Sequence, residues 1–333
     1  MVNAQHIKAV PGRKTDIKDC QWIADLLQHG LLRGSFVPPP PIRRLRDLTR
    51  LRTSLRQDHT TVANRMQKIL EDANIKLASV ASDWLGVSGR AILAQLLAGE
   101  EDATTRADLS RRRLRAKLPQ MPLALQGRLT DHHRWMVRVL WEQLECLEAQ
   151  IAKLNAQIHE QVRPDEDAIA LCTTIPGIEA VAAANLIADI GVDMDQFPSA
   201  QHLASWAGMC SGNHESAGKR LSGKPPKGNA WLRRSLCQAA WAASHTKVTY
   251  LAARFRRLAA RKGKKRALVA VGHSILVSVY HMLKTKRPYC ELGADHLDRI
   301  KADQLKRYFL KRLEQLGVQV TVQNQEHVST LPT

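Results

Sequence analysis

The sequence predicts a mainly α-helical protein of several domains. Apolar residues recur at helical spacing over two long stretches, residues 42–73 and 140–158, and few segments show the alternation typical of a strand. The run VPPPP, residues 37–41, is a stiff break before the first of these helices. With 333 residues and 44% apolar content, the chain is long enough for two or three domains with buried cores.

Changes in composition divide the chain into four predicted parts. These are a short opening unit (1–36), a helical linker (37–165), a compact basic domain (166–292), and a C-terminal helix with a polar tail (293–333). The two long linker helices have the apolar spacing of a coiled coil. They could pair antiparallel within one chain or join two chains into a homo-oligomer, and the sequence favours neither arrangement.

The opening unit contains a helix that is expected to begin after Thr15, a plausible N-cap. Asp16 and Asp19 are three residues apart and therefore share one face of its first turn. Acidic residues in a first turn usually interact with the helix dipole. Two carboxylates on one face are also half of what a two-Mg²⁺ phosphodiester site requires. From spacing alone the pair fits helix-dipole partners or, as the alternative, part of a Mg²⁺ site that would be weak or incomplete.

The basic domain opens with the motif IPGI, in which Pro176 and Gly177 predict a turn followed by a helix that ends at Gly191. The motif resembles the hairpin of helix-hairpin-helix modules, whose turn amides hold a DNA phosphate. Glu179 stands where a second glycine is common, and its carboxylate would repel phosphate. A simple turn between two helices is an equally good interpretation.

Further helices are expected after Ser199, as an N-cap, and from about Trp231. Residues 267–283 form the most apolar stretch, which is short for a membrane span and contains two histidines, so it predicts a buried core helix.

The N-terminus has no apolar signal run. The six cysteines lie far apart without metal-binding spacing, which favours reduced thiols in the cytoplasm.

The positive charge is concentrated in one region. From Ser216 to Cys290 there are 18 Lys or Arg and no Asp or Glu, while the other 32 basic and 31 acidic residues nearly cancel. This is the charge distribution of a surface that binds a polyanion. A nucleic-acid partner is therefore predicted, whereas no feature predicts membrane association.

The stretch CSGNHESAGKRLSGKPPKGNAWLRR, residues 210–234, combines this charge with glycine and serine. Its GKRLSGK nearly matches a phosphate-binding loop, but Pro225 replaces the required Ser or Thr and no apolar strand precedes it, so nucleotide binding is excluded. The predicted nucleic-acid contacts, besides Pro176 and Gly177, are Lys219, Arg220, Lys224, Lys227, Asn229, Arg233 and Arg234.

Ser216 is the candidate nucleophile of this stretch. A serine hydroxyl needs its charge offset and its target oriented, and the surrounding cations would do both at a phosphodiester. Amides at a helix N-terminus near Trp231 are expected to add to the same anion site. The alternative is that Ser216 serves turn chemistry and phosphate hydrogen bonding alone.

Several long runs resemble the insertion sequence 110 family of DEDD-type transposases, which are related to the Piv invertase. The runs SWAGM, GNHESAGKR and KGNAWLRRSLCQAAWAASHTKVTYLAARFRRLAARKGKKRALVAVGHSIL resemble the family's C-terminal transposase domain, and IPGIEAVAAANLIADIG resembles its opening. GRKTDIKDCQWIADLL resembles the end of the RuvC-like domain, and the long helices resemble its coiled-coil linker.

The resemblance implies a DNA recombinase with a Mg²⁺-binding Asp-Glu-Asp-Asp site, a covalent serine nucleophile and an element-encoded guide RNA. Asp16 and Asp19 match the last two carboxylates, and Ser216 best matches the serine, with Ser211 and Ser222 as alternatives. Because the family's first Asp and its Glu lie upstream of this pair, we expect an N-terminally truncated chain of uncertain activity. The alternative from another class is a non-catalytic DNA- or RNA-binding protein.

Overall fold

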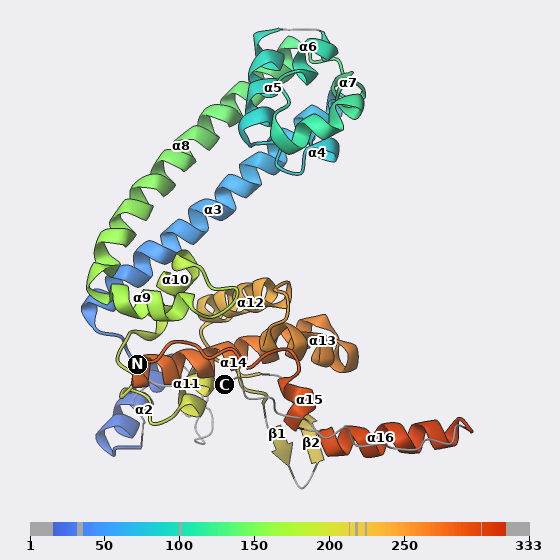
Figure 1. The fold of residues 1–333 in the computed structure, drawn as a ribbon. Helices are drawn as coiled ribbons and strands as arrows, with labels where there is room; N and C mark the ends of the chain where they lie inside the picture. The colour runs from blue at the N-terminus through green and yellow to red at the C-terminus, as the bar shows by residue number, and fades with distance from the viewer. Residues whose placement is uncertain are drawn as a thin grey trace, which may run out of the picture. The chain divides into compact units, whose positions relative to one another are not determined.

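The computed structural model describes residues 16–31, 36–99, 102–212, 214–216, 219–223, 225–300 and 302–317. The chain divides into two compact units. Unit 1 comprises Met1–Pro39 and Asp165–Thr333, and unit 2 comprises Pro40–Pro164. Both are built mainly from helices (Figure 1), which confirms the mainly α-helical prediction, while the RuvC-like remnant and the helix-hairpin-helix turn stay predictions.

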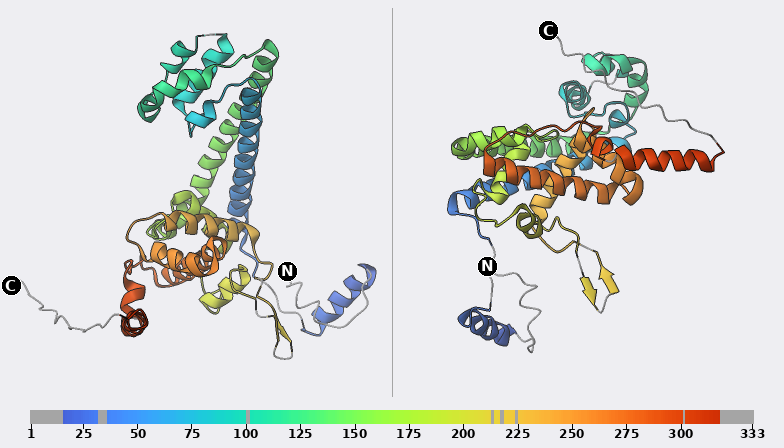
Figure 2. Two further views of the ribbon diagram at one scale, coloured as in Figure 1. Left: turned by 90° about the vertical axis from the view of Figure 1, so that its right-hand side faces the viewer. Right: turned by 60° about the horizontal axis from the view of Figure 1, so that its bottom comes forward.

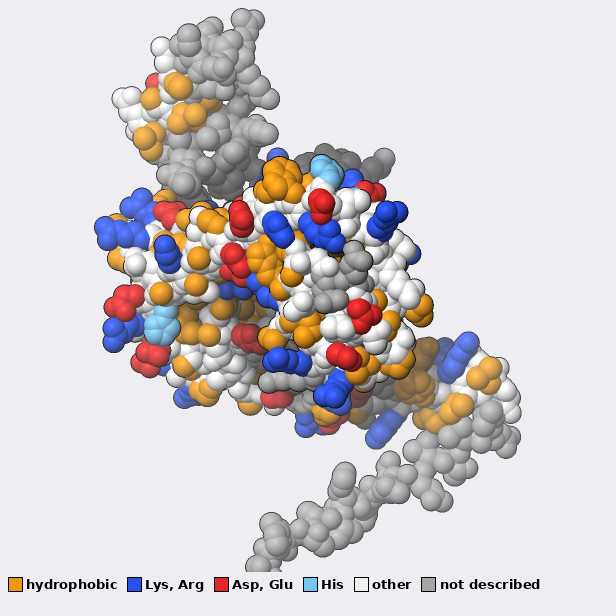
Figure 3. Space-filling model, turned by 90° about the horizontal axis from the view of Figure 1, so that it is seen from above, with side chains coloured by type: hydrophobic (Ala, Val, Ile, Leu, Met, Phe, Trp, Pro, Cys, Tyr) orange, Lys and Arg blue, Asp and Glu red, His pale blue; other side chains and the backbone are white. Residues whose placement is uncertain are grey.

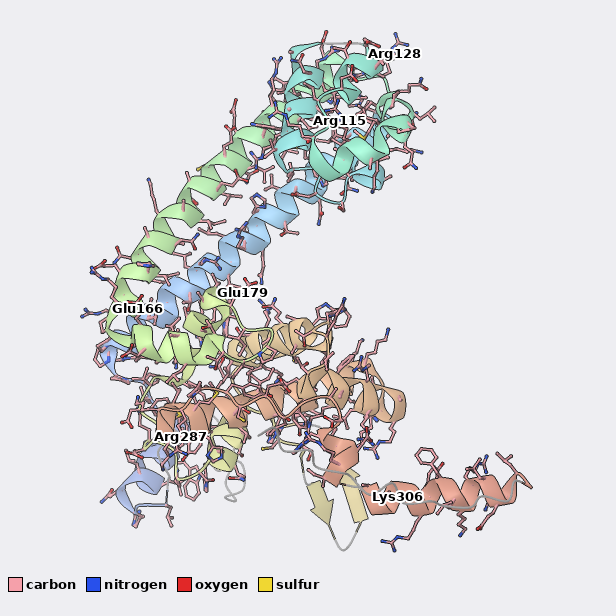
Figure 4. The ribbon with its side chains drawn as sticks, viewed as in Figure 1. Arg115, Arg128, Glu166, Glu179, Arg287 and Lys306 are labelled. Atoms are coloured by element: carbon pink, nitrogen blue, oxygen red, sulfur yellow. The ribbon has the colours of Figure 1, made fainter. Side chains whose placement is uncertain are left out.

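Unit 2 consists of two long helices, α3 (Pro40–Asp72) and α8 (Asp131–Val162), and a small helical head. The head contains α4 (Leu77–Val80), α5 (Val87–Ala98), α6 (Ala103–Ala107), η1 (Arg112–Gln120) and α7 (Met121–Leu125). Arg115 and Arg128 lie on this head (Figure 4). The helical periodicity of residues 42–73 and 140–158 thus corresponds to α3 and α8.

The helices α3 and α8 pack along each other in antiparallel directions. His59 Nε2 lies 3.0 Å from Glu148 Oε1, and nearer the head His133 Nε2 lies 3.7 Å from Asp72 Oδ2. Burial alone would raise the pKa of Glu148, but the hydrogen bond with His59 and the charge of Arg90 lower it. The long helices therefore pair within one chain, the arrangement that the sequence left open, and the homo-oligomer stays a prediction.

One apolar core joins the head to the adjoining ends of the long helices. Its fully buried side chains include Met66, Ile92, Leu93, Met121, Leu125 and Val137. Each buried aliphatic side chain of this size contributes about 1.5–3 kcal/mol of hydrophobic stabilisation. The N-terminus of α8 is fixed beside this core by a capping box, in which Thr130 accepts a hydrogen bond from the backbone N–H of His133.

Unit 1 is organised around α14 (Lys264–Thr285), against which α12 and α13 pack (Figures 1 and 2). Its other elements are α2 (Asp16–Gln28), α9 (Glu166–Thr173), α10 (Ala180–Ile190), α11 (Ala200–Trp206), β1 (His214–Ser216), β2 (Lys219–Ser222), α12 (Ala230–Ser244), α13 (Tyr250–Lys262), α15 (His296–Ile300) and α16 (Ala302–Gln315). The short η2 (Arg163–Asp165) joins the two units.

The helix α14 confirms the predicted core helix at residues 267–283. Ile275 and Val279 are completely buried, and the Tyr280 hydroxyl donates to the carbonyl oxygen of Phe197 at 3.1 Å. By length and composition alone, α14 could cross a membrane, but half of its apolar window is buried inside the protein. Phe36 adds to the same core by packing its ring 4.8 Å from that of Phe197.

The helix starts predicted in the basic domain are confirmed. Ser199 caps α11 by accepting a hydrogen bond from the backbone N–H of His202, and α12 begins at Ala230. The expected N-cap Thr15 lies outside the described residues.

The segment that carries Ser216 is partly a β-hairpin, which the sequence did not predict. The strands β1 and β2 are antiparallel, with Ser216 opposite Lys219 and an irregular register after His214. Two residues lie between the strands, which is the commonest hairpin connection. The sequence did not predict the hairpin because strands of three and four residues are too short to show a clear alternation. Figures 1 and 2 show the hairpin extending away from the helices of unit 1.

Candidate nucleic-acid interface

An exposed basic corner lies where α13 ends and α14 begins. Six exposed side chains form it: Arg256, Arg261, Lys262, Lys264, Lys265 and Arg266. Three of these cations occupy the first turn of α14, where the positive end of the helix dipole makes cations unfavourable. A bound polyanion would relieve this repulsion, so the corner is suited to phosphate binding.

Acidic residues from outside the basic region neutralise part of its charge. Arg257 Nη2 lies 2.8 Å from Asp298 Oδ1, and Lys284 Nζ lies 3.5 Å from Asp195 Oδ1. Both pairs are largely exposed, and such pairs contribute about 0–1 kcal/mol. Figure 3 shows the molecule from above, where the coloured basic and acidic side chains are interspersed. Within the basic region, the two ion pairs therefore offset the charges of Arg257 and Lys284.

The candidate nucleophile lies at the end of β1. The backbone of Ser216 pairs with that of Lys219, but the side chains of Ser216, Lys219 and Arg220 lie outside the described part of the structure. The alternatives are placed differently, since Ser211 is exposed before the hairpin and Ser222 ends β2 opposite His214. The choice among the three serines therefore stays a prediction.

The predicted contacts after the hairpin fall into two groups. Lys227 and Arg234 are exposed, and the Arg234 guanidinium lies 5.3 Å from the centre of the Trp231 ring. Asn229 and Arg233 are half-buried and form hydrogen bonds inside unit 1. Lys224 lies outside the described residues. Lys227 and Arg234 are thus the described side chains of this set that face solvent.

The first amides of α12 are already occupied. The Asn229 side-chain oxygen accepts hydrogen bonds from the backbone N–H groups of Trp231 at 3.0 Å and Leu232 at 3.2 Å. The sequence-based expectation that amides near Trp231 bind phosphate is therefore wrong for these two groups. The cap residue satisfies them because an unpaired amide in a half-buried helix start is costly.

The IPGI turn packs against α12. Gly177 has a φ of +88°, and a Cβ added there would stand 2.4 Å from Ala243 N and 2.8 Å from Ala239 O. Both the positive φ and this close approach require glycine. Pro176 is half-buried, and Glu179 lies at the start of α10 (Figure 4). Packing alone therefore accounts for Gly177, and its contact with phosphate stays a prediction.

The predicted carboxylate pair lies at the start of α2. Asp16 is the first residue of this helix and Asp19 is in its first turn, but neither side chain is described. Among the described residues, no group of three His, Cys, Asp or Glu could hold a metal ion. No geometry therefore joins the pair to the serine.

Two family models match the parts of the chain that contain these candidate residues. The model described as "Transposase IS116/IS110/IS902 family" matches residues 169–256. A DEDD transposase model of insertion sequence 110, described as "Transposase", matches residues 1–75. The chain belongs to the insertion sequence 110 family of transposases. The DEDD match indicates a divalent-metal site in this family of domains, without specifying Mg²⁺.

Two curated proteins are similar to this family member. A "Probable family 20 transposase" of Pseudomonas aeruginosa is 26% identical over 242 residues, which cover 72% of this chain and 62% of the relative. The "Insertion element IS110 uncharacterized 43.6 kDa protein" of Streptomyces coelicolor is 27% identical over 296 residues, covering 82% of this chain and 72% of the relative. The chain thus spans less than two thirds of the first of these relatives.

The sequence-based list of site residues for this chain omits Asp189, Gly208 and Gly228. Asp189 is only 4% exposed and accepts a hydrogen bond from Asn229 at 2.8 Å. Gly208 and Gly228 touch each other through their backbones. Asp189 could have been noticed as the only charged residue in the apolar run AVAAANLIADI, whereas the glycine contact has no sequence signal.

The cysteines of this chain are poorly suited to act as nucleophiles near the serine. All six are free thiols. Burial raises the pKa of the Cys210 thiol, and it raises that of Cys237 despite the opposing charge of Arg233. Burial raises the pKa of Cys172 to about 11. Since the thiolate is the reactive form, these residues are expected to be unreactive at neutral pH.

Proposed function

We propose that this chain acts in DNA transposition, cutting and joining DNA through Ser216 as a covalent nucleophile. The observation that carries the proposal is the position of Ser216 on a hairpin at the beginning of the acid-free basic region, within the match to the transposase family model. The names of both relatives, a probable transposase and an insertion element protein, support the same activity.

The chemistry follows from the residues around the serine. When the Ser216 oxygen attacks a phosphodiester, the oxygen–phosphorus bond forms and the bond to a deoxyribose oxygen breaks. The serine proton is released and a proton is taken up by the leaving oxygen, both through solvent. Negative charge grows on the phosphate oxygens during attack, and Lys219 and Arg220 on the facing strand are the cations nearest in the chain to stabilise it.

The proposed role of the two carboxylates, Asp16 and Asp19, rests on fewer observations than that of Ser216. We propose that Asp16 and Asp19 belong to the RuvC-like DEDD site, because the DEDD family model includes both positions. The metal expected there is Mg²⁺, held by carboxylates, water and substrate phosphate. Since the described residues do not complete a metal site, no step of the reaction is assigned to the metal.

The nucleic-acid partners of the chain are also proposals. The basic region is proposed to bind the ends of the element and its DNA target, and a structured guide RNA is proposed as a second polyanion. The alternative, a non-catalytic nucleic-acid-binding protein, also predicts salt-sensitive binding, because every phosphate contact releases counterions. The two functions differ only in what the serine does.

The test is Ser216→Ala, measured by strand transfer between element ends and target in cells and by DNA affinity in vitro. Strand transfer should be abolished, whereas affinity should change little, because one neutral hydrogen bond contributes about 0.5–1.5 kcal/mol. Lys219→Ala or Arg220→Ala should instead weaken binding and reduce the salt slope by about 1. Lys153→Ala, an exposed position of unit 2, is the matched charge control.

Two results would change the assignment. Strand transfer that survives Ser216→Ala but is lost in Ser211→Ala or Ser222→Ala would transfer the role to that serine. Survival in all three variants would remove serine chemistry from the mechanism, whereas absence of strand transfer in the natural chain would favour the non-catalytic alternative.

A further inference from the structure

The segment that carries Ser216 leaves unit 1 and returns to it at one point, formed by Gly208 and Gly228. A Cβ added to Gly208 would stand 2.7 Å from the Gly228 nitrogen, and one added to Gly228 would stand 2.3 Å from the Gly208 nitrogen. These distances are shorter than any real side chain allows, so both positions require glycine. The two backbones therefore lie in direct contact where the segment begins and ends.

Arg233, on the first turn of α12, bridges the two arms of this segment. Its Nη2 donates to the Gly208 carbonyl at 3.1 Å and to the Pro226 carbonyl at 2.9 Å. One carbonyl belongs to the arm that leads into the hairpin and the other to the arm that leads out. A charged donor satisfying two backbone acceptors is a strong pairing, because charge-assisted hydrogen bonds are about twice as strong as neutral ones.

Asn229 links the returning arm to α10. Its side-chain oxygen caps α12, and its Nδ2 donates to Asp189 Oδ1 at 2.8 Å. Asp189 is buried near the C-terminal end of α10, where the helix dipole disfavours a carboxylate. A buried carboxylate at the wrong end of a helix costs stability, so a role in holding Asn229 gives a physical reason for its presence.

We propose that Asp189 is a positioning residue for the reaction. Together with Asn229, Arg233, Gly208 and Gly228 it forms a neck that holds both ends of segment 209–227, and hence the hairpin with Ser216, in one place. This inference rests on the proposed function for its catalytic consequence. It gives Asn229 and Arg233 a structural role in place of the phosphate contacts expected from their charge and polarity.

The decisive variant is Asn229→Asp in the full chain. Aspartate retains the helix cap but places a second carboxylate against Asp189, so the link between α10 and α12 is lost. Hydrogen exchange of the peptides spanning 208–228 should rise about 10- to 100-fold, as expected for losing a hydrogen bond to a charged group. Exchange in α13 and α14 should be unchanged. Strand transfer should fall at least about tenfold in parallel.

The matched control is the exchanged pair Asp189→Asn with Asn229→Asp. In this double variant the amide at position 189 donates to the carboxylate at position 229, and the net charge equals that of the natural chain. Slow exchange and strand transfer should return, and DNA affinity should equal that of the natural chain. Natural DNA affinity with aspartate at position 229 would also rule out a phosphate contact there, because a carboxylate cannot hold phosphate.

Three outcomes would overturn the proposal that the neck holds segment 209–227. Unchanged exchange of 208–228 in Asn229→Asp would show that Asp189 does not hold the segment. Faster exchange throughout unit 1 would reduce Asp189 to general stabilisation. A double variant that remains as mobile as the single one would exclude the pairing. Absence of strand transfer in the natural chain would contradict the proposed function instead. The exchange data would still decide whether the neck holds segment 209–227.

Discussion

Gly177→Ala should destabilise unit 1 by considerably more than an ordinary glycine substitution. An alanine at a φ of +88° carries about 1–2 kcal/mol of backbone strain. Its methyl group would also stand 2.4 Å and 2.8 Å from backbone atoms of α12, which cannot rotate away as a side chain can. Overpacking of this kind adds about 1–3 kcal/mol. The free energy of unfolding should therefore fall by about 2–5 kcal/mol.

The matched control is Gly263→Ala in the same unit. Gly263 also has a positive φ, of +81°, but an added Cβ would meet no atom within 4 Å, so this variant carries backbone strain without a clash. Guanidinium unfolding of both variants, followed by circular dichroism, measures the difference. If Gly177→Ala and Gly263→Ala lower the free energy of unfolding equally, the close packing of the IPGI turn on α12 is refuted.

Three further predictions concern single contacts. Tyr280→Phe removes a buried hydrogen bond to the Phe197 carbonyl and should lower the free energy of unfolding by about 0.5–1.5 kcal/mol or more, since the carbonyl is left unpaired. Guanidinium unfolding measures this loss, and an unchanged free energy would show that water replaces the hydroxyl. Cys172, with a thiol pKa of about 11, should resist N-ethylmaleimide in the native protein at pH 8 while the exposed cysteines react. Peptide mass spectrometry measures the labelling of each cysteine, and rapid labelling of Cys172 would contradict its burial. Asp102 caps α6, and hydrogen bonds from Thr105 lower its pKa from 3.8 to about 2. The stabilisation of unit 2 by Asp102 should therefore be complete above pH 3.8 and be lost as the pH falls through about 2. Asp102→Asn should remove this pH dependence from the thermal unfolding of unit 2, and an unchanged profile would assign the dependence to other groups.

Periodicity was sufficient to predict the long helices, and high apolar content was sufficient to predict the core helix α14. The apolar positions of α3 and α8 recur with the period of the helix, and that pattern depends only on neighbours along the chain. The pairing of α3 with α8 could not be derived, because an apolar stripe fits a second copy of the chain as well as a helix of the same chain.

Charge predicted a basic surface but not which of its side chains face solvent. Arg233 and Asn229 belong to the same basic run as Arg234, yet they bond to backbone and to Asp189 inside unit 1. The difference depends on Gly208 and Asp189, which lie 25 and 40 positions from their partners along the chain, and no local pattern reveals this. The contact of Gly208 with Gly228 escapes prediction for the same reason, since it is a meeting of two backbones.

Unit 1 is interrupted in the sequence by unit 2, and this has a consequence for synthesis on the ribosome. Unit 2 is one continuous stretch, Pro40–Pro164, whose long helices and head need no later residue to complete their core. Domains generally fold as units, N-terminal ones first, during translation. Phe36, by contrast, packs against Phe197 and Trp206, so it must wait for more than 160 residues to emerge. We therefore expect unit 2 to be folded while the opening segment, with Asp16 and Asp19, is still unpaired and accessible to chaperones.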